Sequence, residues 1–255
     1  MNAPKIGLQG IIFGERNRTD FESILIDLKK AGYDHLESGN LFKSQGEDNA
    51  RRLMEKYGVT QAGAHFGYGD YSNPERLSEN IRYCKAMGVK YMLCSGVSDA
   101  SKAEGYQESA KTFNMVGERL ADEGIRFCYH NHNWEFNDLG GVRGIDILAE
   151  KTDPHMVGFN VDVFWVTFAG FDPAEFILKH KDRVGYFHFK DGLKNEEGKP
   201  VFLELGYGMV DLKACVKAAE ETRLDWIVVE QDNTARTPLE SIGMSRTTLR
   251  NHFGW

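Results

Sequence analysis

The sequence predicts a (β/α)₈ TIM barrel that occupies residues 1–255 as a single domain. Short β-branched or aromatic runs alternate eight times with longer amphipathic runs, and about 250 residues is the usual length of this fold. No low-complexity linker divides the chain. A doubly wound sheet is the competing fold, but the turn after the first strand, Gln9 to Arg16, lacks the G-x-G-x-x-G phosphate loop of that fold.

Each expected strand is a short apolar run that ends at a polar residue. In chain order the strands are Ile6–Gln9, His35–Glu37, Gln61–His65, Tyr91–Ser95, Arg126–His130, Val157–Asp162, Val184–Lys190 and Trp226–Gln231.

Each expected helix carries apolar residues at helical spacing, and several helices are followed by a glycine, which commonly closes a helix in the left-handed conformation. In the first helix Phe21, Ile24 and Leu28 share a face and Gly32 follows it. The helices are Phe21–Ala31, Glu47–Tyr57, Pro74–Met87, Tyr106–Glu123, Gly144–Lys151, Asp172–His180, Asp211–Thr222, and one from Thr237 to the end.

Composition narrows the class of protein. The net charge of −7 and a pI near 5.7 argue against a nucleic-acid partner, because a phosphate backbone selects for a basic surface. The four cysteines form no C-x-x-C pair, so we expect free thiols in a reducing compartment. The N-terminus has no apolar leader and no window approaches a membrane span. We therefore expect a cytoplasmic protein that binds no membrane.

Polar residues at the strand ends indicate where chemistry occurs, because the carboxyl ends of barrel strands meet at one mouth. Imidazoles and carboxylates dominate these positions. They are Glu37, His65, His130, His132, Glu135, Asp162, His188, Lys190, Asp191, Glu230 and Asp232. Like charges gathered at one mouth are costly unless a cation or protons neutralise them.

We predict that Glu135, Asp162, His188 and Glu230 bind one divalent metal ion. Three carboxylates and one imidazole favour Mn²⁺, with Mg²⁺, Co²⁺ or Zn²⁺ as alternatives. The metal would act as a Lewis acid on a sugar carbonyl and its enediolate. Glu135 and Glu230 are the candidate catalytic groups that move the proton.

Several ordered motifs resemble the sugar phosphate isomerase/epimerase group of the xylose isomerase-like TIM barrel superfamily. Tyr129–Phe136 reads Y-H-N-H-N-W-E-F and resembles the Y-H-N-H-x-x-E-F signature of that group. Four further segments resemble its D-x-x-W…A-G-x-D-P, H-x-K-D, E-x-G-x-G and V-E-Q-D motifs. They are Asp162–Trp165 with Ala169–Pro173, His188–Asp191, Glu204–Gly208 and Val229–Asp232.

The resemblance implies a divalent metal held by a carboxylate after strand five together with Asp162, His188 and Glu230. Many relatives carry the strand-five glutamate where this chain has His130. Either Glu135 folds back onto the metal, or His130 is the ligand and Glu135 meets the substrate; we favour Glu135, because a hard cation prefers carboxylate. In the epimerases of the superfamily, glutamates from strands five and eight act on opposite faces of the substrate.

We expect the substrate to contact His65, His130, His132, Trp165 and Lys190. Trp165 stands where several superfamily members place an acid/base histidine, and indole exchanges no protons, so that role is absent or falls to one of the three histidines. Trp165 then either packs in the core or stacks on a sugar ring. Lys190 would hold a substrate oxyanion or phosphate.

The expected function is a metal-dependent sugar isomerase or epimerase that acts through an enediolate on a ketose, aldose or keto-sugar. The alternative is a lyase or dehydratase that acts by the same proton abstraction on a keto-sugar, keto-inositol or 3-keto-glycoside. An abasic-site endonuclease is disfavoured by the charge and by Trp165, and a non-catalytic sugar-binding barrel by the retained Asp162, His188 and Glu230. Phosphorylation of the substrate and a homo-oligomer remain open, since Phe253–Trp255 could pack on the barrel or on a neighbouring subunit.

Overall fold

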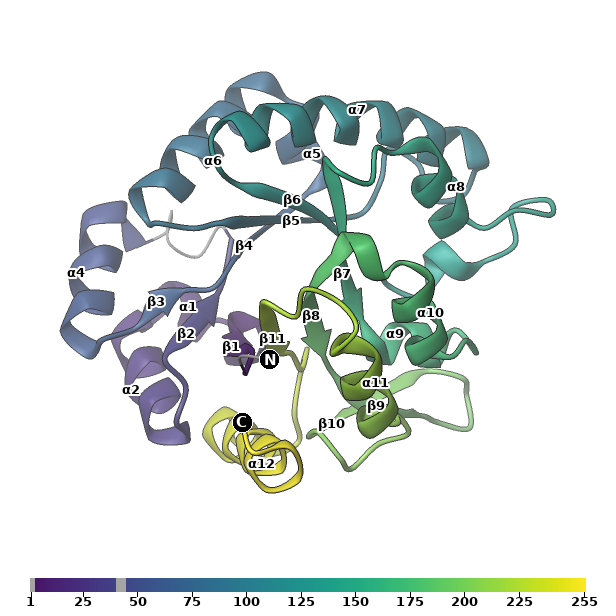
Figure 1. Cartoon of the computed structure of the whole chain (residues 1–255). Helices are drawn as coiled ribbons and strands as arrows, with labels where there is room; N and C mark the ends of the chain where they lie inside the picture. The colour runs from purple at the N-terminus through teal and green to yellow at the C-terminus, as the bar shows by residue number, and fades with distance from the viewer. Residues whose placement is uncertain (1–2, 40–44) are drawn as a thin grey trace.

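The computed structural model describes residues 3–39 and 45–255 and shows parallel strands surrounded by helices (Figure 1). The strands pair in the order β3-β2-β1-β11-β8-β7-β6-β5-β4, and every pair is parallel. Their bounds are β1 Lys5–Gln9, β2 His35–Glu37, β3 Thr60–Gln61, β4 Ala64–Gly67, β5 Tyr91–Ser95, β6 Arg126–His130, β7 Val157–Asp162, β8 Val184–Phe189 and β11 Trp226–Val229.

The third expected strand is split into β3 and β4, and this split is where the ring of strands closes. β3 pairs with β2, whereas β4 pairs with β5. Between the two, Ala62 N donates to Leu36 O and Ser38 N donates to Gly63 O, so the ladder toward β2 continues through the gap. The predicted (β/α)₈ barrel is therefore confirmed, with eight strand positions formed by nine segments.

The main helices agree with the periodicity of the sequence. They are α2 Phe21–Ala31, α4 Glu47–Tyr57, α6 Pro74–Ala86, α7 Ala103–Asp122, α8 Gly144–Lys151, α10 Pro173–Lys179, α11 Leu212–Ala219 and α12 Pro238–Phe253. Side chains of Asp20, Asn73, Asp172, Asp211 and Thr237 accept hydrogen bonds from backbone N–H groups in the first turns of α2, α6, α10, α11 and α12. These N-caps explain why the helices begin where they do.

Two apolar cores lie on the two sides of the barrel wall. The smaller one fills the barrel and consists of Ala62, Tyr91, Leu93, Cys128, Tyr186, Trp226 and Val228. The larger one packs between the wall and the helices and includes Phe113 of α7 and Tyr129 of β6. Because successive strand residues point to opposite faces, Cys128 faces the interior and Tyr129 faces the helices.

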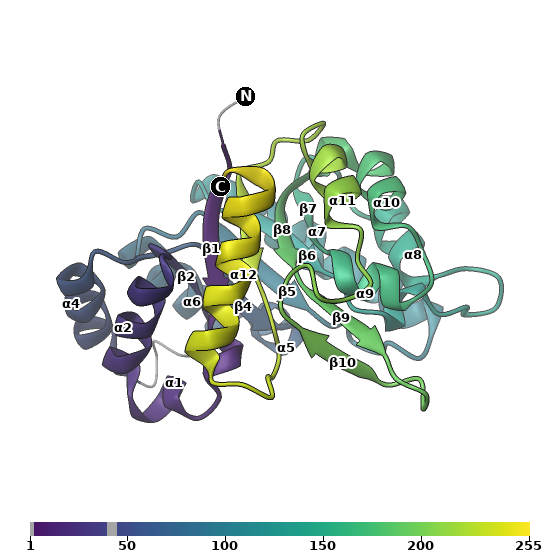
Figure 2. The ribbon, with the colours of Figure 1, turned by 90° about the horizontal axis from the view of Figure 1, so that it is seen from below.

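The sequence did not predict a two-stranded hairpin that follows β8. β9 (Asp191–Lys194) pairs antiparallel with β10 (Pro200–Leu203), and the hairpin lies at the end of the barrel where the strands finish (Figure 2). Its base is held by Asp191, whose carboxylate accepts hydrogen bonds from the backbone N–H groups of Gly192, Gly206, Gly208 and Val210 at 2.9–3.1 Å.

Three further structural facts bear on the sequence predictions. No helix in the two described ranges is long and apolar enough to cross a membrane. Cys84, Cys94, Cys128 and Cys215 are all free and buried. At the C-terminus Trp255 packs on Phe253 and against the core of its own chain, and its carbonyl oxygen accepts from Arg246.

Candidate active site and metal centre

The strand register directs a set of polar side chains into the mouth of the barrel. His188 of β8 lies level with Asp162 on β7 and with Val228 on β11, and Val228 belongs to the interior core. Neighbours at one level of a parallel sheet share a face, and side chains alternate along each strand. Asp162 and His188 therefore point inward, as does Glu230, two residues beyond Val228.

Four residues form a group with the composition of a metal site: His130, Asp162, His188 and Glu230. One ligand atom of each lies within 4.8 Å of those of the others, and all four side chains are buried. They come from β6, β7, β8 and the end of β11. Three of them belong to the predicted quartet, and the fourth is His130 in place of Glu135.

Glu135 lies outside this group, which corrects the expectation that it folds back onto the metal. Its Oε1 accepts from the Tyr129 hydroxyl at 2.6 Å, and its Oε2 accepts from the backbone N–H of His132 at 2.8 Å. Tyr129 faces the helices and stands next to Phe113, so Glu135 is drawn to the outer side of the wall. His130, one residue on from Tyr129, points inward.

Each of three group members has one polar atom engaged by the protein and another directed at the group. Asp162 Oδ1 caps α9 (Val163–Phe168) by accepting from Trp165 N at 2.9 Å. His188 Nε2 lies 2.8 Å from Glu37 Oε2. The side-chain amide of Asn160 lies 3.3 Å from His130 Nδ1. These contacts leave Asp162 Oδ2, His188 Nδ1 and His130 Nε2 for a ligand.

Three buried atoms of the group fit a divalent cation. Asp162 Oδ2, His188 Nδ1 and Glu230 Oε2 are buried and make no hydrogen bond with good geometry. His188 Nδ1 and Glu230 Oε2 lie in ion-pair contact with each other, and Lys190 Nζ is 3.8 Å from Asp162 Oδ2. Two imidazole nitrogens and two carboxylates suit Mn²⁺, Co²⁺ or Zn²⁺ better than Mg²⁺, which prefers oxygen ligands.

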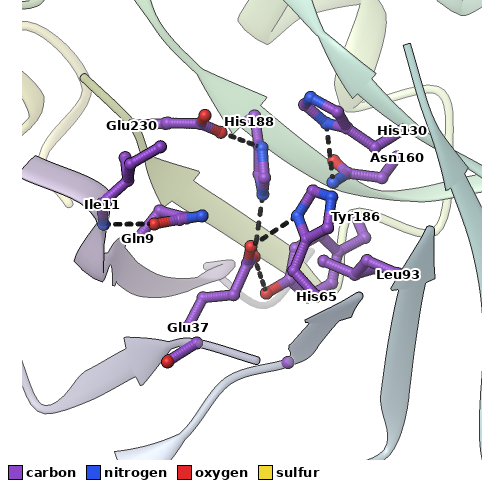
Figure 3. A network of polar contacts seen from close by, with 12 residues as sticks. Gln9, Ile11, Glu37, His65, Leu93, His130, Asn160, Tyr186, His188 and Glu230 are labelled. Carbon is purple, nitrogen blue, oxygen red and sulfur yellow. Dashed lines mark hydrogen bonds and ion pairs between the residues drawn. The ribbon is translucent and has the colours of Figure 1, made fainter. Parts of the chain in front are cut away.

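Glu37, the last residue of β2, is the centre of a hydrogen-bond network beside the group (Figure 3). Its Oε2 accepts from the Tyr186 hydroxyl at 2.7 Å and contacts His188 Nε2, and its Oε1 lies 3.3 Å from His65 Nδ1. A second triad of potential ligands, Glu37, His65 and His188, shares these contacts. The hydrogen bonds already occupy Glu37, so we assign the metal site to the first group.

The charges of the group follow from burial and from these neighbours. Burial opposes ionisation of Glu37, but the charge of His188 and hydrogen bonds from His188 and His65 lower its pKa to about 2. Burial opposes protonation of His188, yet Glu37 and Glu230 raise its pKa to about 10. Burial raises the pKa of Asp162 to about 7, and burial holds the pKa of His130 well below its usual range.

Lys190 and Trp165 lie beside the group and are not among the described residues that line the cavity. Lys190 Nζ contacts Asp232 Oδ1 at 2.6 Å and Glu230 Oε1 at 3.4 Å, and only 1% of its side chain is exposed. The ammonium also lies over the rings of Trp165 and Phe202, at 5.0 and 4.7 Å. Trp165 therefore packs in the core, and Lys190 balances the carboxylates of Glu230 and Asp232.

A cavity of about 720 Å³ opens above the group. Of the predicted substrate contacts, His65, His130 and His132 line it, together with Glu230 and Asp232. The ring of His132 stacks on Trp134, with centroids 3.9 Å apart. The other described residues that line the cavity come from the end of β1 and the segment that follows it, and from the ends of β2, β4 and β5: Gln9, Gly10, Ile11, Gly14, Glu15, Asn17, Arg18, Ser38, Gly39, Phe66, Gly67 and Ser95. The volume suits a small-molecule ligand.

Three residues support the site although the sequence assigned them no role. Asn131 holds the ends of β6 and β7 together, because its Oδ1 accepts from Asp162 N and its Nδ2 donates to Asp162 O. Asn160 and Tyr186 point inward from strand interiors. Period-two alternation, counted backward from Asp162 and His188, would have placed both in the barrel.

Comparison with known proteins confirms the family that the motifs indicated. A family model described as xylose isomerase-like TIM barrel matches residues 25–251. The chain belongs to this family. Family members are enzymes, so the barrel described above is the framework of an enzyme.

Individual relatives carry different reaction names. The chain is similar to an inosose dehydratase of Geobacillus thermodenitrificans, with 24% identity covering 92% of this chain and 90% of that protein. It is 26% identical to an inosose dehydratase of Geobacillus kaustophilus over 67% of this chain and 61% of that protein. A sugar phosphate isomerase/epimerase structure from Parabacteroides distasonis superposes with a TM-score of 0.83, at 23% identity, and covers 99% and 96% of the two chains.

One further solved structure of this fold contains a metal. The IOLI protein with a bound zinc atom superposes with a TM-score of 0.72, at 15% identity, and covers 97% of each chain.

Proposed function

We propose that this protein is a metal-dependent lyase that eliminates water, or another substituent β to a ketone, from a cyclic keto-sugar or keto-inositol. The observation that carries this proposal is the placement of Glu135. Epimerisation by two opposed glutamates needs a strand-five carboxylate at the substrate, and Glu135 is instead bonded to Tyr129 on the outer side of the wall. The inosose dehydratases among the relatives support the same choice.

A divalent cation held by His130, Asp162, His188 and Glu230 would supply Lewis-acid stabilisation of the charge that develops on a substrate oxygen. Mn²⁺ remains our first candidate and Zn²⁺ the second, since two imidazoles are present and a solved structure of the same fold holds zinc. Three buried atoms of Asp162, His188 and Glu230 that make no hydrogen bond with good geometry suit a specific cation site.

The proton transfer is assigned to His65. It lines the cavity, its ring lies 4.9 Å from that of His130, and its Nδ1 faces Glu37, which leaves Nε2 for the substrate. Nε2 would remove the proton from the carbon next to the ketone, and the electron pair of that C–H bond would form the new C=C bond as the β C–O bond breaks. The leaving hydroxide would take the proton from His65, so that one water and an unsaturated ketone result.

An incubation of the reconstituted protein with keto-inositols and 3-keto-glucosides in D₂O tests the proposal. We expect ultraviolet absorbance from a conjugated product and loss of the leaving group by mass spectrometry. Deuterium incorporation without loss of a group would instead support the isomerase or epimerase function that the sequence analysis favoured. The free, buried cysteines are consistent with action in the reducing cytoplasm.

A further inference from the structure

Glu37 is the one carboxylate at the mouth that touches two histidines with its two oxygens, among the residues that the structure describes. It is fully buried and ends β2, on the side of the barrel opposite β7 in strand order. It belongs to neither the metal group nor the surface of the cavity. A buried carboxylate in such a place needs partners, because an unpaired buried charge is costly.

The Oε2 atom of Glu37 fixes the tautomer and the orientation of the His188 ring. Its 2.8 Å contact with Nε2 requires a proton on that nitrogen, since a carboxylate can only accept. Nδ1 is then the nitrogen that faces Glu230, and it would bind the metal once its own proton is lost. A histidine ligand whose second nitrogen donates to a carboxylate is held in one tautomer and one orientation.

The Oε1 atom of Glu37 fixes the tautomer of His65 in the same way. Its contact with Nδ1 at 3.3 Å is longer, and 14% of the His65 side chain is exposed toward the cavity. A proton on Nδ1 leaves Nε2 as the basic atom. The two rings stand side by side, with centroids 5.8 Å apart, so one carboxylate orients one ring toward the metal group and the other toward the cavity.

We propose that Glu37 is a positioning residue that sets the tautomers of His188 and His65 together, and so links metal binding to proton transfer. This inference rests on the proposed function for its second half. The Tyr186 hydroxyl donates to the same Oε2 at 2.7 Å, and without it the two histidines still contact the carboxylate. Tyr186 touches the carboxylate but offers no metal ligand, so it provides a matched control.

The test is metal affinity of the purified full chain, measured with Zn²⁺ by competition against a chromophoric chelator. We expect Glu37→Gln to raise the dissociation constant about 10–100-fold, the usual effect of losing such a partner. Tyr186→Phe should change it less than about threefold. The visible spectrum of the Co²⁺ form should change in Glu37→Gln and remain unaltered in Tyr186→Phe, because only the former turns the His188 ring.

The role of the second oxygen of Glu37, Oε1, is tested with a variant of His65. His65→Gln should leave the Zn²⁺ dissociation constant within about threefold of the wild-type value while kcat falls about 10²–10⁴-fold. Glu37→Gln at saturating metal should also lose kcat, since its amide cannot accept from both histidines. Wild-type affinity in Glu37→Gln with an unaltered Co²⁺ spectrum would overturn the inference.

A measurement on the wild-type chain covers the case in which Glu37→Gln does not fold. Histidine ¹⁵N NMR of the Zn²⁺ form should show His188 with the proton on Nε2 and the metal on Nδ1, and His65 with the proton on Nδ1. The reverse tautomer at His188 would refute the role of Glu37. Absence of stoichiometric metal from the wild type would refute the proposed function, and metal binding with the reverse tautomers would refute this inference alone.

Discussion

Removal of the Glu135 side chain should destabilise the fold and leave the metal site in place. In Glu135→Ala the hydroxyl of Tyr129, a residue that is 1% exposed, and the partly buried N–H of His132 both lose their acceptor. An unsatisfied buried donor costs about 1–3 kcal/mol, so we expect a loss of roughly 2–5 kcal/mol. For a chain of this size that corresponds to a fall in Tm of about 5–20 °C.

Glu135→Gln is the matched control. The amide oxygen can accept from His132 N while the amide nitrogen donates to the Tyr129 oxygen, so we expect a change of about 1 kcal/mol or less near pH 5. Both variants should bind Zn²⁺ with the wild-type affinity, measured by chelator competition on protein kept below its Tm. A variant with wild-type Tm and lost metal would show that Glu135 is a ligand, and would refute the assignment to His130.

The pH dependence of stability in the wild type and in Glu135→Gln tests whether burial raises the pKa of Glu135. Burial, opposed by the Tyr129 and His132 hydrogen bonds, raises the pKa of Glu135 to about 7. The folded chain therefore keeps a proton on Glu135 that the unfolded chain loses near pH 4.5. As the pH rises from 4.5 to 7, the free energy of unfolding of the wild type should decrease by up to about 3 kcal/mol because of this group. Glu135→Gln has no titrating carboxyl at this position. The difference in free energy of unfolding between this variant and the wild type, measured by urea denaturation, should therefore change by up to about 3 kcal/mol between pH 4.5 and 7.

Three other outcomes follow from the site and the hairpin. Asp162 has a pKa of about 7 and His188 a pKa of about 10, and each must lose its proton to bind a metal. The logarithm of the Zn²⁺ association constant, measured by calorimetry, should therefore rise by about one unit per pH unit from pH 7 to 9 and about twice as steeply below pH 7. An association constant that does not change with pH would contradict this. Asp162→Asn keeps the cap on Trp165 N but replaces the free oxygen, so metal affinity should fall at least about 10-fold with apo Tm nearly unchanged; loss of the fold would show that the cap depends on the charge. Asp191→Asn removes one of two oxygens that accept four N–H groups, and should cost about 2–4 kcal/mol in chemical denaturation, whereas a neutral result would mean that water satisfies the loop.

Most of the barrel could be predicted from the sequence because its signals are local. The helix Phe21–Ala31 has a cap at Asp20, an apolar face and Gly32 in the left-handed conformation, and its bounds in the structure are the predicted ones. The β9–β10 hairpin could not be predicted in this way. Its strands are short, and Asp191 holds its base through contacts with residues 15 to 19 positions away, a spacing that periodicity does not register.

The candidate site was predicted where strand alternation decides it. Asp162, His188 and Glu230 lie at inward positions at the ends of apolar strands, and the structure brings them together. The choice between His130 and Glu135 rested on which ligand atoms a hard cation prefers, and that preference does not say where either side chain points. Alternation contains the missing information, since Cys128 and His130 share a face and Tyr129 takes the other.

The segment at the end of β6 places polar residues on both sides of the barrel wall. Glu135 fixes the backbone of His132 through the N–H bond, and Asn131 fixes the end of β7 through Asp162. His130 stands directly before these anchored residues and points to the interior of the barrel, away from Glu135. The hydrogen-bonded carboxylate and the metal-facing imidazole therefore have separate roles, and a substitution at either should fail in a different assay: stability for Glu135, and metal affinity for His130.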